Sequence, residues 1–312
     1  MEEKFLHCLA EYTKSFWVGS GNNIQILEHP NDFQFMKAVS KYTPVILRGV
    51  LDNWSILKDE FPLDSLQSLS PTHVQVNFTR YGNADSVESV SHPDNEVFVY
   101  PAEVTLSFDS FREMLENKQP EDAVPYLSQQ NDNLRQCFPE LVKAIAPSIA
   151  LADSAFGIDK LEAVNLWVGD ERSVTSLHKD YYENMYAVVM GEKVFHLFPP
   201  SDSVFMHESS YSTRRYELKS GETAHTESRH LRKDDLILND AEDSPTISWI
   251  AYDPTDSDSQ KRFPLTKYAS CIECKVSAGE ILYIPAMWYH RVSQSCTTIA
   301  VNYWYDMEFD FR

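Results

Sequence analysis

The stretch that decides the fold is TSLHKDYYENMYAVVMGEKVFHLFPPSD, residues 175–202. Its β-branched and aromatic runs are separated by polar or glycine-containing breaks, which is typical of consecutive strands. Further runs of this kind lie on both sides of the stretch: VNLWVG (164–169), CIECKV (271–276), EILYIP (280–285), WYHRV (288–292) and TTIAVNYWY (297–305). Many short strands with little helix between them predict a β-sandwich or a β-barrel.

The remainder of the chain is organised around this β-rich part. Periodic apolar positions predict helices, with strands between them in the N-terminal part of the chain. The expected helices are 3–16, 32–40, 107–117 and 133–146, and the expected early strands are 44–50 and 74–78. We therefore divide the chain into an N-terminal α+β region, 1–120, and a barrel domain, 121–312. Residues 201–265 are polar, acidic and rich in serine, so we expect an insert that forms a long surface excursion.

Charge and composition exclude several classes of function. The chain has 312 residues, with 27 Lys and Arg against 47 Asp and Glu, which gives a net charge of −20. This charge repels nucleic acid phosphates and anionic membranes and attracts a basic peptide or protein. The sequence contains neither a run of 18 apolar residues nor a secretory signal pattern, so we expect a cytoplasmic or nuclear location, or both.

One histidine–acid triplet stands at the end of a strand-like run. Three such triplets occur: His92-Pro-Asp94, His178-Lys-Asp180 and His225-Thr-Glu227. Because residues i and i+2 of an extended chain share a face, His178 and Asp180 can converge on one ion. His290, in a later strand-like run, is a candidate third ligand, and two imidazoles with one carboxylate suit non-haem Fe(II). On these residues alone, a turn-capping His178 and a core-packing His290 are the favoured alternative.

The neighbours of His178 distinguish it from the other two triplets. Thr175 precedes it, Asn184 follows, and Lys193 lies fifteen residues after it, whereas the matching positions after His92 and His225 hold Ser107 and Asp240. With AGEILYIPAMWYHRV (278–292) and IAVNYWYD (299–306), the pattern resembles the Jumonji-C (JmjC) family of 2-oxoglutarate oxygenases. The resemblance spans most of the chain, including LRGVLDNW (47–54) and VPYLSQQND (124–132).

This resemblance implies a fold and a set of site residues. The fold is mainly β with flanking helices, a double-stranded β-helix (a jelly roll, or cupin-like barrel) with an N-terminal α+β elaboration. The implied cofactors are Fe(II), 2-oxoglutarate and O₂. The implied metal-binding and catalytic residues are His178, Asp180 and His290, and the implied cosubstrate-binding residues are Tyr126, Thr175, Asn184, Lys193 and Asn302. Lys193, with Thr175 and Tyr126, would bind the far carboxylate of 2-oxoglutarate, and the two asparagines its metal-bound end.

The resemblance also implies an activity, a dioxygenase that acts on a protein. A lysyl hydroxylase of this family would act on a lysine-bearing partner such as a translation-associated GTPase. N-methyl-lysine demethylation, histone-tail proteolysis and a non-catalytic cupin-type binding module remain alternatives, and a homodimer remains open. The net charge predicts an acidic groove that leads to the iron, in which the substrate ammonium meets a carboxylate. We expect no nucleic acid or membrane partner.

Overall fold

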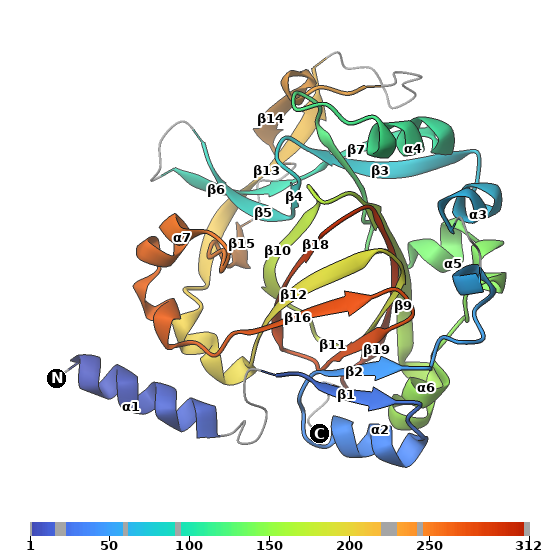
Figure 1. Cartoon of the computed structure of the whole chain (residues 1–312). Helices are drawn as coiled ribbons and strands as arrows, with labels where there is room; N and C mark the ends of the chain where they lie inside the picture. The colour runs from blue at the N-terminus through green and yellow to red at the C-terminus, as the bar shows by residue number, and fades with distance from the viewer. Residues whose placement is uncertain are drawn as a thin grey trace.

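Two β-sheets face each other and form the barrel at the centre of the computed structural model (Figure 1). The structure describes residues 2–15, 23–58, 62–90, 95–219, 230–241 and 246–308. No helix within these ranges is long and apolar enough to cross a membrane.

The larger sheet has nine strands, most of them antiparallel. In spatial order they are β1 (Gln25–Glu28), β2 (Val45–Arg48), β17 (Ile281–Ile284), β11 (Tyr182–Met190), β19 (Thr298–Asp306), β9 (Leu161–Gly169), β8 (Val124–Leu127), β3 (His73–Thr79) and β7 (Ala102–Ser107). Strands from the N-terminal 120 residues thus continue the same sheet as the later barrel strands.

The facing sheet has five strands: β16 (Ile272–Ser277), β12 (Glu192–Phe198), β18 (Tyr289–Gln294), β10 (Val174–Lys179) and β4 (Asn83–Ala84). The chain crosses between the sheets at β9–β10, β11–β12, β16–β17 and β18–β19, so successive strands alternate between the two faces. This alternation is a double-stranded β-helix, and it confirms the predicted fold class. Apolar side chains such as Trp167, Phe195 and Leu282 pack between the sheets.

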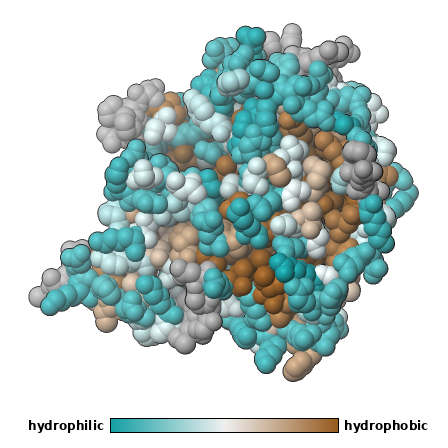
Figure 2. Space-filling view, viewed as in Figure 1, coloured by the Kyte–Doolittle hydropathy of each residue, from teal (hydrophilic) through white to brown (hydrophobic). Residues whose placement is uncertain are grey.

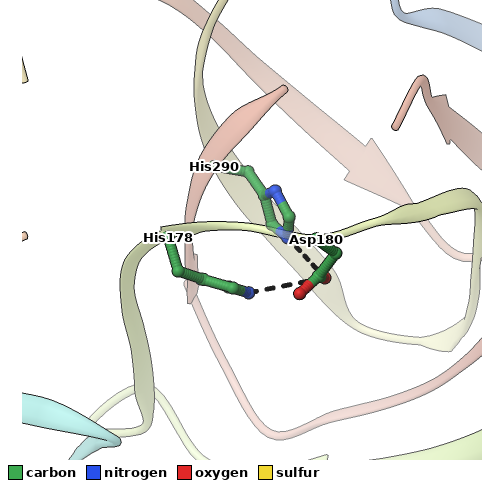
Figure 3. Close-up of side chains that lie close together, drawn as sticks. All are labelled: His178, Asp180 and His290. Atoms are coloured by element: carbon green, nitrogen blue, oxygen red, sulfur yellow. Dashed lines mark ion pairs between the residues drawn. The ribbon is translucent and has the colours of Figure 1, made fainter. Parts of the chain in front are cut away.

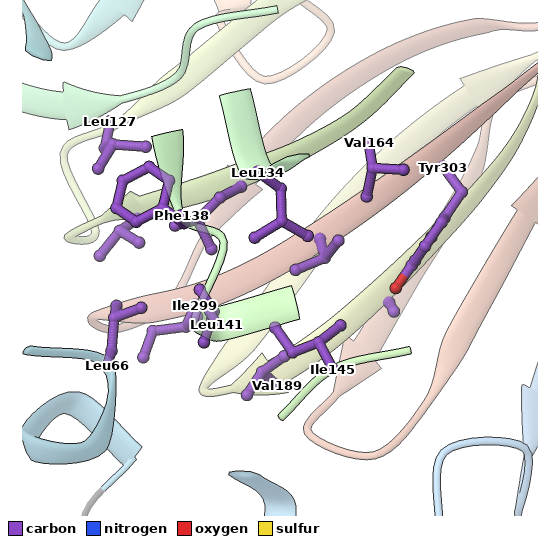
Figure 4. Close-up of a cluster of buried hydrophobic side chains, with 14 of the residues drawn as sticks. Leu66, Leu127, Leu134, Phe138, Leu141, Ile145, Val164, Val189, Ile299 and Tyr303 are labelled. Atoms are coloured by element: carbon purple, nitrogen blue, oxygen red, sulfur yellow. The ribbon is translucent and has the colours of Figure 1, made fainter. Parts of the chain in front are cut away.

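Helices cover the outer face of the nine-stranded sheet. Around it lie α2 (Asp32–Val39), α3 (Pro62–Leu69), α4 (Phe108–Glu116), α5 (Asn133–Cys137) and α6 (Ala150–Phe156) (Figure 1). Figure 4 shows Leu66, Leu134 and Ile145 from this layer against Val164 and Tyr303 of the sheet. Full burial of one such side chain contributes about 1.5–3 kcal/mol to the free energy of folding. This second hydrophobic core therefore stabilises the outer face of the nine-stranded sheet.

Three of the four predicted helices are confirmed, and one is wrong. The first is α1 (Glu2–Ser15), the second is α2, which begins with a capping box between Asn31 and Gln34, and the third is α4. The helix expected at 133–146 ends at Cys137 and resumes only as the 3₁₀ turn η2 (Leu141–Lys143). Pro139 explains the break, because proline lacks an N–H and disfavours helical backbone in the residue before it.

The expected surface excursion at 201–265 is also wrong for its described residues. β13 (Ser209–Leu218) pairs with β6 (Glu96–Tyr100), which in turn pairs with β5 (Ser86–Ser89). The segment also forms β14 (Leu236–Asp240), β15 (Thr246–Trp249) and α7 (Ser257–Arg262). Short 3₁₀ turns lie in or at the ends of the segment: η4 (Pro200–Phe205), η5 (Lys233–Asp235) and η6 (Pro264–Tyr268). Two more 3₁₀ turns lie elsewhere in the chain, η1 (Ser55–Lys58) and η3 (Ile158–Lys160). The third sheet thus formed lies beside the barrel and brings β15 to the edge of β10 (Figure 1).

Candidate metal centre and cosubstrate pocket

His178, Asp180 and His290 converge at one end of the five-stranded sheet (Figure 3). β10 pairs with β18 so that His178 lies directly opposite His290, with their ring centroids 4.2 Å apart. Asp180 follows β10, and its Oδ2 lies 3.6 Å from Nε2 of His178 and 3.5 Å from Nε2 of His290. The strand register thus brings His290 to His178 and Asp180, although His290 is distant from them in the sequence.

Backbone carbonyls orient both imidazoles. Nδ1 of His178 lies 2.8 Å from the carbonyl oxygen of Ser176, and Nδ1 of His290 lies 3.0 Å from that of Trp288. An Nδ1–H that donates to these carbonyls leaves the lone pair on Nε2, which points toward Asp180. This arrangement is the usual way in which proteins fix the tautomer and direction of a metal-binding histidine.

The electrostatics of the triad favour a cation at its centre. Burial by itself would raise the pKa of Asp180, but His178 and then His290 reverse the shift and hold that pKa far below its usual value. Burial would likewise lower the pKa of His178, and the Asp180 charge outweighs it, so the pKa of His178 is raised. Oδ2 of Asp180 is buried without a hydrogen bond from any described residue. Two imidazole nitrogens and one ionised carboxylate oxygen are a donor set that fits Fe(II).

The second group of predicted residues lies deeper in the barrel, around Lys193. Lys193 is only 1% exposed, and its ammonium donates to the Tyr126 hydroxyl at 3.2 Å and to Oε1 of Gln294. No carboxylate pairs with it among the described residues, and burial lowers its pKa to about 7. A buried ammonium without a counter-ion is costly, so the pocket suits an anion such as the far carboxylate of 2-oxoglutarate.

Hydroxyl groups surround this ammonium. The Tyr126 hydroxyl is hydrogen-bonded with the side chains of Thr175 and Tyr186, and burial raises the pKa of Tyr126 well above its usual value. These phenols therefore stay protonated and can donate hydrogen bonds to a carboxylate. The structure thus places Tyr126, Thr175 and Lys193 together, as the sequence predicts.

The two predicted asparagines form a separate pair on the nine-stranded sheet. Asn184 of β11 and Asn302 of β19 are both buried, and Nδ2 of Asn302 lies 3.4 Å from Oδ1 of Asn184. Oδ1 of Asn302 accepts a hydrogen bond from the Trp167 indole at 2.8 Å. This bond fixes the orientation of the Asn302 side-chain amide, so that its Nδ2 faces Asn184.

Sequence reasoning missed three residues of this region. Gln294 binds the Lys193 ammonium from the same strand that carries His290. Trp249 of β15 stacks on the His178 ring, with centroids 5.8 Å apart and an interplanar angle of 4°. Asp85, just after β4, lies close enough to His178 for each to shift the other's pKa. Gln294 lies beyond the strand-like run predicted at 288–292, and no local pattern indicates any of the three.

Four described acids line a hollow beside the barrel. The hollow, of about 380 Å³, lies between α7 and the strands β10 and β18, and its acids are Glu96, Asp253, Asp256 and Asp258. Arg262 pairs with Glu96, Arg291 with Asp253 at 2.9 Å, and Lys261 with Asp258 at 2.7 Å. His92 and His225, with their acids, lie outside the described residues.

Comparison with known proteins assigns the family. A family model described as a cupin-like domain matches residues 30–311. The human bifunctional peptidase and (3S)-lysyl hydroxylase JMJD7 is 36% identical over 269 residues, 86% of this chain and 79% of that protein. The chain belongs to the JmjC family of cupin-like proteins.

Other JmjC relatives carry different activities in their names. JmjC domain-containing protein E of Dictyostelium discoideum is 34% identical and covers 92% of this chain and 85% of its own length. Lysine-specific demethylase JMJ32 of Arabidopsis thaliana is also 34% identical, over 91% of this chain and 81% of its own length. As a JmjC protein, the chain is a 2-oxoglutarate-dependent dioxygenase that uses Fe(II).

Proposed function

We propose that this JmjC protein hydroxylates a lysyl side chain of a protein partner, such as a translation-associated GTPase. The observation that carries the proposal is the similarity to a lysyl hydroxylase across 86% of the chain, together with the His178, Asp180 and His290 cluster. The net charge of −20 supports a lysine-bearing partner, because opposite charges accelerate association.

The residues of the site have separable tasks in this proposal. His178, Asp180 and His290 hold Fe(II), which with 2-oxoglutarate supplies O₂ activation and yields succinate and CO₂. Lys193 binds the far carboxylate of 2-oxoglutarate, and the amides of Asn184 and Asn302 orient its other end. The apolar residues between the sheets keep water away from the reacting groups.

Mass spectrometry tests the reaction. The enzyme is incubated with Fe(II), 2-oxoglutarate and a lysine-bearing candidate protein, and each lysine is examined for the gain of one oxygen. We expect a gain that requires 2-oxoglutarate and disappears in His178→Ala. His196→Gln is the matched control, because His196 belongs to the same sheet but pairs with Glu273, 3.5 Å away, outside the triad.

The same assay separates the alternatives. Removal of a methyl group from N-methyl-lysine, without oxygen gain on unmodified lysine, supports demethylation, the activity named for JMJ32. Backbone cleavage that persists without 2-oxoglutarate supports a peptidase, the other activity named for JMJD7. A binding module would release no succinate.

The oligomeric state needs a separate measurement. Light scattering of the purified chain distinguishes a monomer from the homodimer that the resemblance leaves open.

A further inference from the structure

Asp85 occupies a position beside the metal cluster that no role described so far explains. β4 runs parallel to β10 with Ala84 opposite Thr175, so Asp85 comes next to Ser176. The Ser176 hydroxyl donates to the Asp85 carbonyl at 2.6 Å, and the Ser176 carbonyl accepts from His178. Asp85 is therefore tied to the strand that presents His178.

The backbone of Asp85 is unusual for a residue with a side chain. Its φ is 49°, in the left-handed region, which Asp and Asn tolerate better than other non-glycine residues. This conformation ends β4 and redirects the chain into β5. Asparagine can take the same conformation, so Asp85→Asn removes the charge without adding backbone strain.

The Asp85 carboxylate has no strong partner. Among the described residues no cation forms an ion pair with it, and its side chain accepts one hydrogen bond, from the Gln130 amide at 3.3 Å. Arg215 attracts it from a distance but is paired with Glu103 at 3.2 Å. Asp85 is half-buried, so a ligand can reach its carboxylate. A carboxylate with one weak neutral partner gains a charge-assisted hydrogen bond from a cation that arrives with a ligand.

Trp249 contacts both the metal cluster and the residue beside Asp85. Its ring stacks on His178, and its indole nitrogen donates to the Ser176 hydroxyl at 3.0 Å, while the same hydroxyl donates to the Asp85 carbonyl. A lysine side chain combines an apolar stem with a cationic end. A stem laid along the Trp249 ring would bring its carbons beside His178 and its ammonium to the segment that carries Asp85.

Building on the proposed lysyl hydroxylation, we propose that the Asp85 carboxylate binds the ammonium group of the substrate lysine and selects lysine over side chains without a cation. Asp85 would thereby determine specificity without binding the metal or 2-oxoglutarate. The ion pair also restores to the carboxylate the hydrogen bonds that it lacks in the free protein.

The test measures binding of two probes that differ only in the cation. Nα-acetyl-lysine methylamide and Nα-acetyl-norleucine methylamide have the same carbon chain, and only the first carries an ammonium. Mn(II) and 2-oxoglutarate are bound to the enzyme, and relaxation of the probe protons by Mn(II) reports binding without turnover. We expect Asp85→Asn to weaken the lysine probe about 10- to 100-fold, as for a charge-assisted hydrogen bond, and to leave the norleucine probe unchanged.

Control variants separate this effect from damage to the fold. Glu88→Gln removes another partly buried carboxylate from the same segment, one that accepts from Tyr216 instead, and should leave the probe preference unchanged. Asp85→Glu keeps the charge and should retain more of the preference than Asp85→Asn. Equal loss of both probes in Asp85→Asn, or a wild-type enzyme that binds both equally or binds neither, would overturn the proposal.

The two proposals can fail separately. Succinate release without peptide depends on the metal and on 2-oxoglutarate, and it should be equal in wild type and in the control Glu88→Gln. If lysine is never oxidised but the Asp85-dependent preference for the lysine probe persists, the reaction assignment fails and lysine recognition stands. If lysine is oxidised equally well by Asp85→Asn, the role of Asp85 fails and the hydroxylase stands.

Discussion

Lys193 combines burial and charge in a way that makes its protonation state measurable. Its pKa is lowered to about 7 because the ammonium is buried, whereas an unfolded lysine titrates near 10.5. A carboxylate that binds beside this ammonium favours the charged form and raises the pKa again. Cosubstrate binding and proton binding at Lys193 are therefore coupled.

The first prediction concerns this coupling. At pH 8, binding of 2-oxoglutarate to the Mn(II)-loaded enzyme should take up close to one proton, and the uptake should fall at pH 6, where Lys193 is already charged. Calorimetry in two buffers with different ionisation enthalpies measures the uptake. Lys193→Met should abolish it and weaken 2-oxoglutarate binding about 10- to 100-fold, whereas Thr175→Val, which removes a neutral donor, should cost less. Unchanged uptake in Lys193→Met would assign the proton to another group.

The second prediction concerns the metal. His178→Ala and His290→Ala should each lower the affinity for Mn(II) or Co(II) strongly, because each removes one of the three ligands in the cluster. Metal titration followed by the visible absorption of Co(II) measures the loss. His196→Gln should bind metal as wild type does, and an equal loss in that variant would place the metal elsewhere.

Eight site positions, the three implied metal ligands and the five implied cosubstrate-binding residues, could be named from the sequence. They match motifs of the JmjC family that can be recognised within short stretches of sequence. Gln294 belongs to no such spacing, and its contact with Lys193 depends on the pairing of β12 with β18. Trp249 and Asp85 reach His178 through β15 and β4, two short strands without a strong local signal. Contacts of this kind are properties of register, so a single sequence predicts them poorly.

At the scale of elements, what the sequence predicts depends on how apolar the element is. Strands buried on both faces, such as β11 and β19, stand out as continuous apolar runs. β13 has only two buried residues among ten, Thr213 and Tyr216, so its composition resembles that of a loop. The interrupted helix after Asn133 is a different error, because Pro139 was a visible signal against continuing it.

The third prediction concerns the start of α2. Asn31 accepts a hydrogen bond from the Gln34 amide nitrogen at 2.9 Å, and the Gln34 side chain accepts from the Asn31 amide nitrogen at 3.0 Å. Asn31→Ala should therefore lower the free energy of unfolding by about 0.5–2 kcal/mol, as measured by urea denaturation. Because Asn31 lies far from the cluster in sequence and α2 packs behind the large sheet, metal affinity should not change. A loss of metal binding together with stability would show that α2 supports the site directly.

At the scale of the molecule, charge and apolar surface are segregated. In the space-filling view, hydrophobic residues gather over the barrel in the middle and hydrophilic residues cover the surrounding elements (Figure 2). The net charge could be counted from the sequence, but the pairing of the acids could not. Glu96, for example, meets Arg262 only because α7 packs against the β6 strand. The acidic groove expected from composition stays a prediction.

The fourth prediction concerns global stability as a function of pH. Between about pH 7 and the unfolded value near 10.5, the unfolded chain binds more protons at Lys193 than the folded chain does. The free energy of unfolding should therefore rise with pH in this window, by up to about 1.4 kcal/mol per pH unit from this one residue. Urea denaturation at pH 7.0, 7.5, 8.0 and 8.5, without metal or 2-oxoglutarate, measures the slope.

The matched variant for this prediction is Lys193→Met, which removes the titrating group and keeps an apolar stem. Its slope over the same pH range should be smaller than that of the wild type by the Lys193 contribution. Equal slopes would mean that the buried ammonium does not lose its proton in the folded state. The range stops at pH 8.5 because Cys271 and Cys274, whose pKa values burial raises to about 12, add the opposite slope above that pH.

The pairing of His178 with His290 has a consequence for how the protein matures. The two histidines belong to strands that are distant in the sequence and become neighbours only when β18 joins β10. A growing chain therefore exposes a histidine and a carboxylate long before the third ligand is synthesised, and such a partial set holds a metal weakly. The complete set of three ligands therefore exists only once β18 has paired with β10, so tight metal binding is expected late in folding.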